Sequence, residues 1–390
     1  NLNYNENSGI SLPGILTSPN FYGYGQGSGG PTYGFLFGSQ ADIRRIAVEN
    51  GWISNSDLMN DPYMMNSTKS LDANLQWMPI SDLRIDFTLL KRTNTNLSQA
   101  GYNYVSTDYV GYRDAFTNEM LTYSRSAWMF KTTFKNSDEI YNNMQTYARQ
   151  ISQVMGDPST TDSEGFTQGY KMSNAYVLIP AFQAAVEGKT PEKLNNPRKV
   201  GIPLPNWKLV YSGLTNIPIV NSQFTKFDIL HSYNSTYTGA GIQSSMDYFN
   251  ARNIDDAFDV NGNRYNPYTY SQVGYVESFA PFIGADMTLR NNMQLRAQMN
   301  KDRTYLLGLV NNTLTEDDSK EYIIGLGYII KDFKLKMNIG GKMKTMKSDL
   351  NIRGDISIRD SKTTIRNILL NDSQVTGGQT LLGVKISADY

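Results

Sequence analysis

The chain has 390 residues, with 36 basic and 36 acidic side chains, one histidine and no cysteine. Charges that cancel do not favour a nucleic acid as partner, and the missing cysteines exclude disulfide and thiolate chemistry. A single histidine also excludes His-based metal clusters and catalytic triads built from this chain alone. We therefore expect no enzyme activity, no metal and no cofactor.

The chain has no run close to the roughly 18 apolar residues that a membrane-spanning helix requires. Strands that cross a membrane hide their apolar half in alternation, so this composition still allows a barrel. The sequence opens NLNYNENSG, without an initiator methionine or a signal-peptide pattern, and stops inside an alternating run. We interpret it as a piece of a longer protein.

Residues 23–30, GYGQGSGG, contain a formal GxGxxG motif at Gly25, Gly27 and Gly30. A dinucleotide-binding motif of this kind must open a helix, and here Pro31 follows instead. The pattern favours a flexible or close-packed loop.

The first clear hairpin lies at residues 71–77 and 83–89. Apolar side chains alternate with polar ones along both segments, and PISD supplies the turn between them. Arg84 and Asp86 fall on the polar side. Further strands are predicted at 122–134, 207–212 and 227–238.

Long segments at 93–121, 136–206 and 239–276 separate these strands. We expect 239–276 to be a long loop. In 136–206 apolar residues recur at three and four positions, which predicts a helix-containing insertion. Ser137 and Asn174 are candidate helix caps.

The second helix of the insertion is predicted to end before Gly188, and Pro180 should kink or shorten it. Such a folded insertion should sit at the rim or in the lumen of a barrel, where it would constrict the pore or dock a partner. Strand parity does not place all three long segments on one side, so a strand is missing from this count or the insertion crosses to the opposite rim.

The second half of the chain repeats the hairpin design, and about eleven strands are predicted in all. Residues 283–289 and 295–299 form one pair. Residues 322–330 and 333–339 form another, with a turn at Lys331 and Asp332. His231 shares a strand face with aromatic and aliphatic residues, which favours a packing or interfacial role.

Residues 349–360, DLNIRGDISIRD, alternate strictly. A soluble sandwich and a membrane barrel produce the same pattern, with the apolar face turned to a core or to lipid. In the barrel interpretation Leu350, Ile352, Ile356 and Ile358 face lipid. The candidate lumen-facing residues are Arg84, Asp86, Arg290, Arg296, Lys334, Lys336, Asn351, Arg353, Asp355, Arg359 and Lys385.

The candidate lumen residues carry both signs of charge. An ion-selective filter favours one sign, so the mixture predicts a broadly hydrated wall without steep ion selectivity. DVNGN at 259–263 places oxygen-bearing side chains at alternating positions, but Gly262 comes too early for an EF-hand loop, so a turn is favoured over a weak calcium site.

Four segments resemble the C-terminal part of the SprA/Sov family, the outer-membrane translocon of the type IX secretion system. They are YGFLFGSQADIRRIAVENGWIS at 33–54, LPNWKLVYSGLTNIP at 204–218, FAPFIGADMTLRNNMQLR at 279–296 and KSDLNIRGDISIRDSKTTIR at 347–366. The resemblance implies an all-β fold in which residues 1–390 form part of a very large transmembrane antiparallel β-barrel.

The same resemblance implies a location in the bacterial outer membrane, in contact with its lipid, and a gated conduit for folded, secreted client proteins. It implies two further partners, a barrel of the PorV type and a periplasmic plug protein. Two alternatives stay open on the residues alone. One is a TonB-type or usher-like transporter, and the other is a soluble carbohydrate-binding β-protein whose aromatic residues stack on sugars.

Overall fold

The computed structural model describes residues 1–16, 33–54, 56, 61–105, 110–112, 115–191, 200–251, 257–339 and 342–389. The side chains at 33, 36, 104, 105, 110, 336–339 and 342–344 are not described. The glycine-rich segment 23–30 lies outside the described residues.

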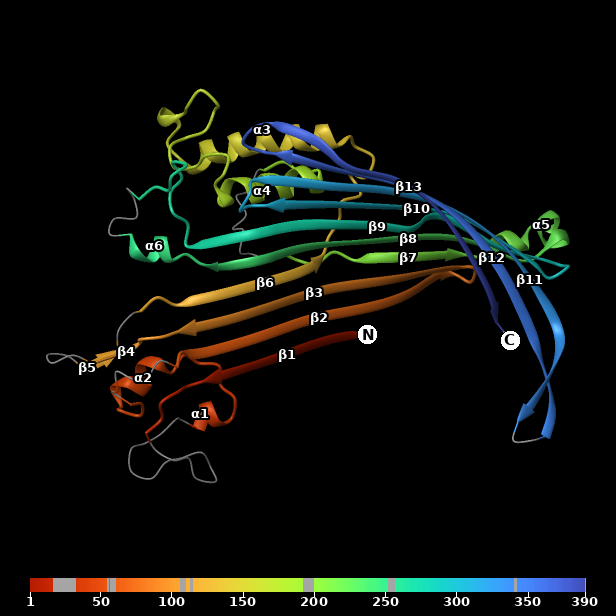
Figure 1. Ribbon diagram of the computed structural model, residues 1–390, viewed down its shortest axis with the longest axis horizontal. Coiled ribbons are helices and arrows are strands. Elements are labelled where there is room, and N and C mark those ends of the chain that lie inside the picture. Colours follow the sequence, from red (N-terminus) through yellow and green to blue (C-terminus); the bar gives the residue numbers. More distant parts are fainter. Residues whose placement is uncertain are drawn as a thin grey trace.

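One antiparallel sheet of eleven strands dominates the molecule (Figure 1). Strands neighbouring in sequence are mostly neighbours in the sheet, as in a meander, and β1 and β13 are its two edges. The sheet strands are β1 (Leu2–Ser11), β2 (Tyr63–Ile80), β3 (Leu83–Gln99), β6 (Asn118–Ser126), β7 (Asn206–Tyr211), β8 (Phe224–Ser244), β9 (Tyr268–Leu289), β10 (Met293–Gly308), β11 (Thr313–Ile339), β12 (Lys342–Asn367) and β13 (Asp372–Asp389).

The remaining elements are short or belong to the insertion. A separate two-stranded sheet pairs β4 (Asn103–Val105) with β5 (Val110–Tyr112). The helices are α1 (Tyr33–Leu36), α2 (Arg44–Glu49), α3 (Ser137–Met155), α4 (Ala175–Glu187), α5 (Pro218–Gln223) and α6 (Met246–Asn250), with 3-10 turns η1 (Pro158–Thr160) and η2 (Gly213–Asn216). In the part of the chain that the structure describes, no helix has both the length and the apolar composition needed to cross a bilayer.

The strand register keeps apolar side chains on one side of the sheet and polar side chains on the other from strand to strand. Ile356 on β12 lies opposite Ile324 on β11 and Val384 on β13, while its neighbour Asp355 lies opposite Gly325 and Lys385. We call the side that bears Ile356 the apolar face and the side that bears Asp355 the polar face. Because successive residues of a strand point to opposite faces, the ladder pairs assign every strand residue to one of them.

The predicted turn at Lys331 and Asp332 is wrong. Residues 313–339 form one strand, and the register shifts between Ile330 and Phe333. Asp332 has a φ of 57°, and its N–H donates to the carboxylate of Asp349 at 3.0 Å. Lys331 and Asp332 together lie opposite Asp349, so β11 has one extra residue, and this bulge returns Phe333 to the apolar face. The apolar positions change from even-numbered to odd-numbered residues at the bulge, and this change in the alternation was interpreted as a turn.

The insertion interrupts one strand position of the sheet. β6 and β7 both pair with β3 on one side and with β8 on the other, so they are two halves of one strand. At the break, side chains replace missing backbone partners. Ser126 Oγ accepts from the N–H of Leu90 at 3.2 Å, and Asn206 Oδ1 accepts from the N–H of Ser235 at 2.9 Å.

This split resolves the strand-parity conflict. Because β6 and β7 cross the sheet once between them, the strand ends that flank segments 12–62, 100–117 and 245–267 all lie at one end of the sheet, which we call the insertion end (Figure 1). The opposite end carries the connections 81–82, 212–223 and 290–292, together with the end of β11 at Ile339 and the start of β12 at Lys342. The strand predicted at 122–134 is shorter, because the chain leaves the sheet after Ser126 to enter the insertion.

The loop predicted at 239–276 is also shorter than expected. β8 continues to Ser244 and β9 starts at Tyr268. Gly241, with a φ of 63°, falls inside β8, at a point where the pairing with β6 is irregular.

The insertion contains the two predicted helices, and Asn174 caps α4 by accepting from the N–H of Tyr176. Asn136, not Ser137, caps α3, because its side chain accepts from the N–H of Asp138. Pro180 stays inside α4, which ends at Gly188 in the left-handed conformation. The helix is therefore not shortened at the proline.

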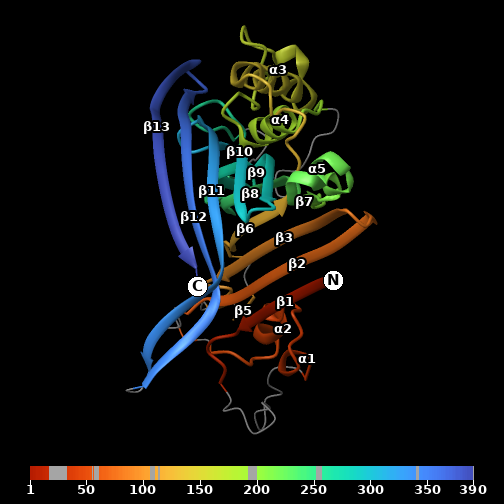
Figure 2. The same cartoon turned by 90° about the vertical axis from the view of Figure 1, so that its right-hand side faces the viewer.

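The main core lies between α3, α4 and the sheet. Phe182 of α4 packs against Tyr275 of β9, and Met144 of α3 is also fully buried. Tyr275 pairs with Tyr305 across the ladder and lies on the apolar face. The insertion therefore covers the apolar face at its own end (Figure 2). A smaller core under α2 contains Ala47, and Tyr63 lies in it as well.

Candidate functional site

The part of the apolar face beyond the insertion forms a broad exposed surface, which we call the belt. Its large side chains are between 40% and 77% exposed. They are Leu75, Trp77, Ile283, Tyr322, Ile324, Leu326, Tyr328, Ile352, Ile356, Ile358, Leu382, Val384 and Ile386. A contiguous apolar surface of this kind is rare on monomeric soluble proteins and marks contact with another apolar phase or partner.

The regular part of the belt, before the bulge, has a definite width along the strands. On β11 it runs from Tyr322 to Ile330, and on β12 it runs from Ile358 to Leu350. Eight steps at ~3.3 Å per residue give about 26 Å along the strand. Nine residues match the ~9 to 11 that a tilted strand uses to cross a bilayer. All four candidate lipid-facing residues, Leu350, Ile352, Ile356 and Ile358, lie in the belt face.

The polar face carries nearly all of the predicted polar residues. The ladder register places ten of the eleven candidates there: Arg84, Asp86, Arg296, Lys334, Lys336, Asn351, Arg353, Asp355, Arg359 and Lys385. For Lys336 this rests on the backbone register, since its side chain lies outside the described residues. These residues share one face but do not form one cluster.

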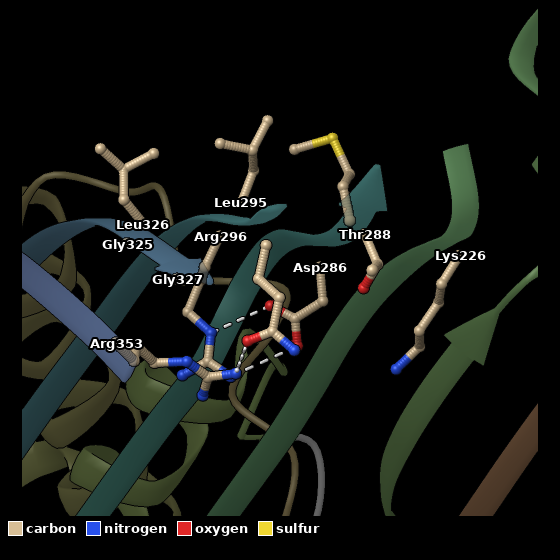
Figure 3. Close-up of a pocket in the computed structure, with 11 residues that line it drawn as sticks. Lys226, Asp286, Thr288, Leu295, Arg296, Gly325, Leu326, Gly327 and Arg353 are labelled. Atoms are coloured by element: carbon tan, nitrogen blue, oxygen red, sulfur yellow. Dashed lines mark hydrogen bonds and ion pairs between the residues drawn. The ribbon is translucent and has the colours of Figure 1, made fainter. Parts of the chain in front are cut away.

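One group of polar-face residues lines a cavity of about 110 Å³ on β8–β12 (Figure 3). Arg296 forms an ion pair with Asp286 at 3.0 Å, and Arg353 donates to Gln294 at 3.1 Å. Figure 3 shows the two arginines and Asp286 on the side opposite to Leu295 and Leu326. Paired charges of both signs make this a hydrated surface rather than a site for one ion.

Glycine makes room in this wall. A Cβ on Gly325 would lie 2.1 Å from Oδ1 of Asp355, so the aspartate side chain extends over the glycine backbone. The sequence analysis did not identify Lys226 and Gln294 as lining residues. They lie on different strands, and alternation within a strand does not show which residues of two strands lie next to each other.

A second polar group lies further along the same face. Arg359 donates to Ser319 at 2.9 Å and lies 3.6 Å from Asp302, while Asn300 donates to Glu321 at 2.9 Å. At the other side of the sheet, Arg84 pairs with Asp86 on the same strand. Mixed, mutually paired charges therefore extend across the polar face.

Arg290 does not belong to the polar wall. It follows β9 in the turn at the opposite end, and its guanidinium donates to the backbone and side-chain oxygens of Asn221 at 2.8 and 2.7 Å. The prediction is wrong because strand alternation was continued into a turn. Lys334 lies in the β11–β12 hairpin, which projects beyond the neighbouring strands (Figure 1).

Two buried arginines of the sheet, Arg303 and Arg366, attach the insertion to the apolar face. Arg303 of β10 pairs with Glu316 of β11 at 2.7 Å, and both side chains are almost fully buried. The same guanidinium donates to the carbonyls of Thr132 and Lys135 at 3.1 and 3.2 Å. Arg366 of β12 pairs with Asp138 at 2.6 Å.

A buried ion pair joins α4 to the sheet. Glu187 accepts from Arg125 at 2.9 Å and from the hydroxyl of Tyr275 at 2.5 Å. Burial opposes ionisation of Glu187, but the hydrogen bonds from Lys189 and Tyr275 and the charge of Arg125 outweigh it, so its pKa is lowered. In the sequence, charged residues such as Arg303 occupy positions of the apolar face. They are the signal that another part of the protein covers this end of the face.

The insertion lies on the face opposite to the predicted lumen residues. Its helices pack on Tyr275 and Tyr305, which share the belt's face. The insertion therefore does not lie on the face that is predicted to line a lumen. Constriction of a pore and partner docking both stay predictions.

An aromatic cluster marks the boundary between the belt and the insertion. Trp207 stacks on Tyr233 at 4.5 Å between ring centroids, and Phe279 packs on Tyr233 at 4.9 Å. His231 lies within this cluster, and its Nδ1–H donates to the carbonyl of Phe282 at 2.6 Å. The predicted packing role of His231 is confirmed.

The segment DVNGN is a turn. Asp259 Oδ1 accepts from the N–H groups of Asn261 and Asn263 at 2.8 Å each, so its oxygen is used by the turn itself. Among the described residues no group of three or more His, Asp or Glu side chains is arranged to hold a metal ion.

A scan against protein-family models finds no match for this chain, and a search of curated proteins finds no significant relative.

Proposed function

We propose that this chain is a wall segment of a large outer-membrane β-barrel that conducts secreted proteins. The observation that carries the proposal is the pair of faces: an exposed belt of bilayer width on one side of the sheet, and an extended, mixed-charge surface on the other. In the proposed barrel the belt contacts lipid and the polar face lines a wet lumen.

A closed barrel of this kind needs further strands. β1 and β13 lie at opposite edges of the sheet and do not pair with each other. An open edge is a template for another strand, so additional strands from the same polypeptide would complete the wall. A wall larger than eleven strands encloses a wide lumen, which suits folded cargo better than a small solute.

The connections also suggest an orientation. Outer-membrane barrels have short periplasmic turns and longer extracellular loops. We infer that the insertion end is extracellular and that the end with the turns 81–82 and 290–292 is periplasmic.

Export of proteins is favoured over ion or nutrient transport by two features. The charges of the polar face are paired and of both signs, as in Arg296 with Asp286, which does not select one ion. The four segments that resemble the SprA/Sov family supply the second support. They also point to a PorV-type barrel, a periplasmic plug and secreted client proteins as partners.

Cysteine labelling tests the assignment of the faces, because the chain has no cysteine of its own. Single variants Asp355→Cys and Ile356→Cys are labelled in intact outer membranes with a membrane-impermeant maleimide. We expect aqueous labelling at position 355 and protection by lipid at position 356. Preferential aqueous labelling at position 356 would overturn the assignment.

Depletion of the full-length protein tests the transport function. We expect many unrelated secreted proteins to accumulate together in the periplasm. Intact secretion with loss of uptake of one small solute would favour the TonB-type alternative. Recovery of the protein in the aqueous fraction without detergent would favour the soluble carbohydrate-binding alternative.

A further inference from the structure

A groove runs along the apolar face over β1–β3. It consists of two adjoining cavities of about 540 and 530 Å³. The first is lined by Leu2, Leu75 and Phe87, and the second by Tyr4, Leu71 and Ile202, among others. The ladder pairs make the cavities neighbours, because Leu2 lies opposite Ala73 and Tyr4 opposite Leu71.

The groove has a definite length and a wall of its own. From Leu75 to Lys69 along β2 is six steps, or about 20 Å at ~3.3 Å per residue. Segment 200–205, which returns from the insertion, forms one side, with Val200 and Ile202 lining one cavity and Pro205 the other. Ile202 is 82% exposed, so the groove opens away from the sheet.

The end of the groove nearer the insertion carries positive charge. Lys69 is paired with Glu6 at 3.0 Å. The ammonium of Lys91 donates to the carbonyl of Gly201 at 3.0 Å, and no carboxylate among the described residues pairs with it. An ammonium has three donors, so Lys91 can still donate to a further acceptor.

We propose that this groove holds an acyl chain of a membrane lipid whose anionic phosphate headgroup lies against Lys91 and Lys69. The inference rests on the proposed membrane location and adds a specific ligand to it. The apolar rows of β1–β3 fit the hydrocarbon chain, and the uncompensated charge of Lys91 lies where the belt ends and a headgroup begins. Basic residues at this depth attract anionic lipids.

Native mass spectrometry of the protein in neutral-detergent micelles tests the proposal. The probes are phosphatidylglycerol and phosphatidylcholine with identical acyl chains. We expect preferential binding of phosphatidylglycerol, and in the double variant Lys69→Gln/Lys91→Gln a loss of about tenfold in its affinity. Free inorganic phosphate should not compete, because it lacks the acyl chain.

Two further variants separate charge from shape. Ala73→Trp fills the groove and should lower binding of both lipids. The control Lys208→Gln removes an exposed lysine on the polar face of β7 and should leave lipid binding unchanged.

Two results would overturn the inference. One is equal binding of the two lipids by the unmodified protein, and the other is an equal loss of affinity in the lysine double variant and the Lys208→Gln control. If the protein remains detergent-dependent in either case, only the lipid site fails. If it is soluble without detergent and binds no lipid, the proposed function fails with it.

Discussion

The belt and the insertion-covered end are two regions of the same face of one sheet, and they carry different side chains. On β11 the belt presents Ile324 and Leu326, whereas eight residues before Ile324 the same face presents the buried Glu316. The bare region presents apolar side chains, whereas the region covered by protein holds buried, paired charges such as Arg303 and Glu316 beside core residues such as Tyr305. The element that covers a face therefore decides which residues that face can hold, because a buried charge is tolerated only where partners are built for it.

The largest effect should come from breaking the covered region. Arg303→Met leaves Glu316 buried without its partner and removes donors to the carbonyls of Thr132 and Lys135. Loss of one partner of a buried pair costs ~3 to 5 kcal/mol. We expect a clearly lower thermal midpoint and faster proteolysis of the insertion.

The double variant Arg303→Met/Glu316→Leu is the control, because it removes both charges and should recover part of the loss. A cost of Arg303→Met below ~1 kcal/mol would show that the pair does not hold the insertion.

A charge in the bare region should cost somewhat less. Ile356→Arg on the belt should destabilise the bilayer-inserted protein by ~2 to 4 kcal/mol if the residue lies near the membrane midplane. Urea-dependent folding into lipid vesicles measures this cost. Ser357→Arg, one residue away on the polar face, is the matched control and should change stability little. Equal costs at both positions would remove the distinction between the faces.

Acid should weaken the covered region without affecting the belt. The pKa of Glu187 is lowered from 4.5, so its contribution to stability is complete above about pH 4.5 and falls as the pH drops through the lowered value. Over that pH window α4 should become less firmly attached to the sheet. Protease accessibility of the insertion measures this change. In Glu187→Gln this part of the pH dependence should be absent; its persistence would assign the acid sensitivity to other groups.

The smallest effect is expected at Arg290. Its two hydrogen bonds to Asn221 are exposed to solvent, so Arg290→Ala should cost less than ~1 kcal/mol. It should also leave any conductance of the reconstituted full-length protein unchanged, because the residue lies outside the polar wall. A change in conductance would indicate that Arg290 lines the lumen after all.

Sequence alternation by itself determined the faces of the side chains along the regular strands of the second half, but not that β11 continues through Lys331 and Asp332. Period-2 patterning is local, so Ile356 and Asp355 could be assigned to opposite faces without any knowledge of neighbours. Helix caps are equally local, and Asn174 and Gly188 bounded α4 as expected.

Only the tertiary structure decided how these elements combine. The bulge at Asp332, the union of β6 and β7 in one strand position, and the covering of Tyr275 by α4 all depend on residues far apart in sequence. Strand pairing and helix docking are long-range contacts that leave no periodic mark on the segments they join. For that reason the sequence could predict that the sheet has an apolar and a polar face. Only the tertiary structure showed which part of the apolar face the insertion covers and which part stays exposed.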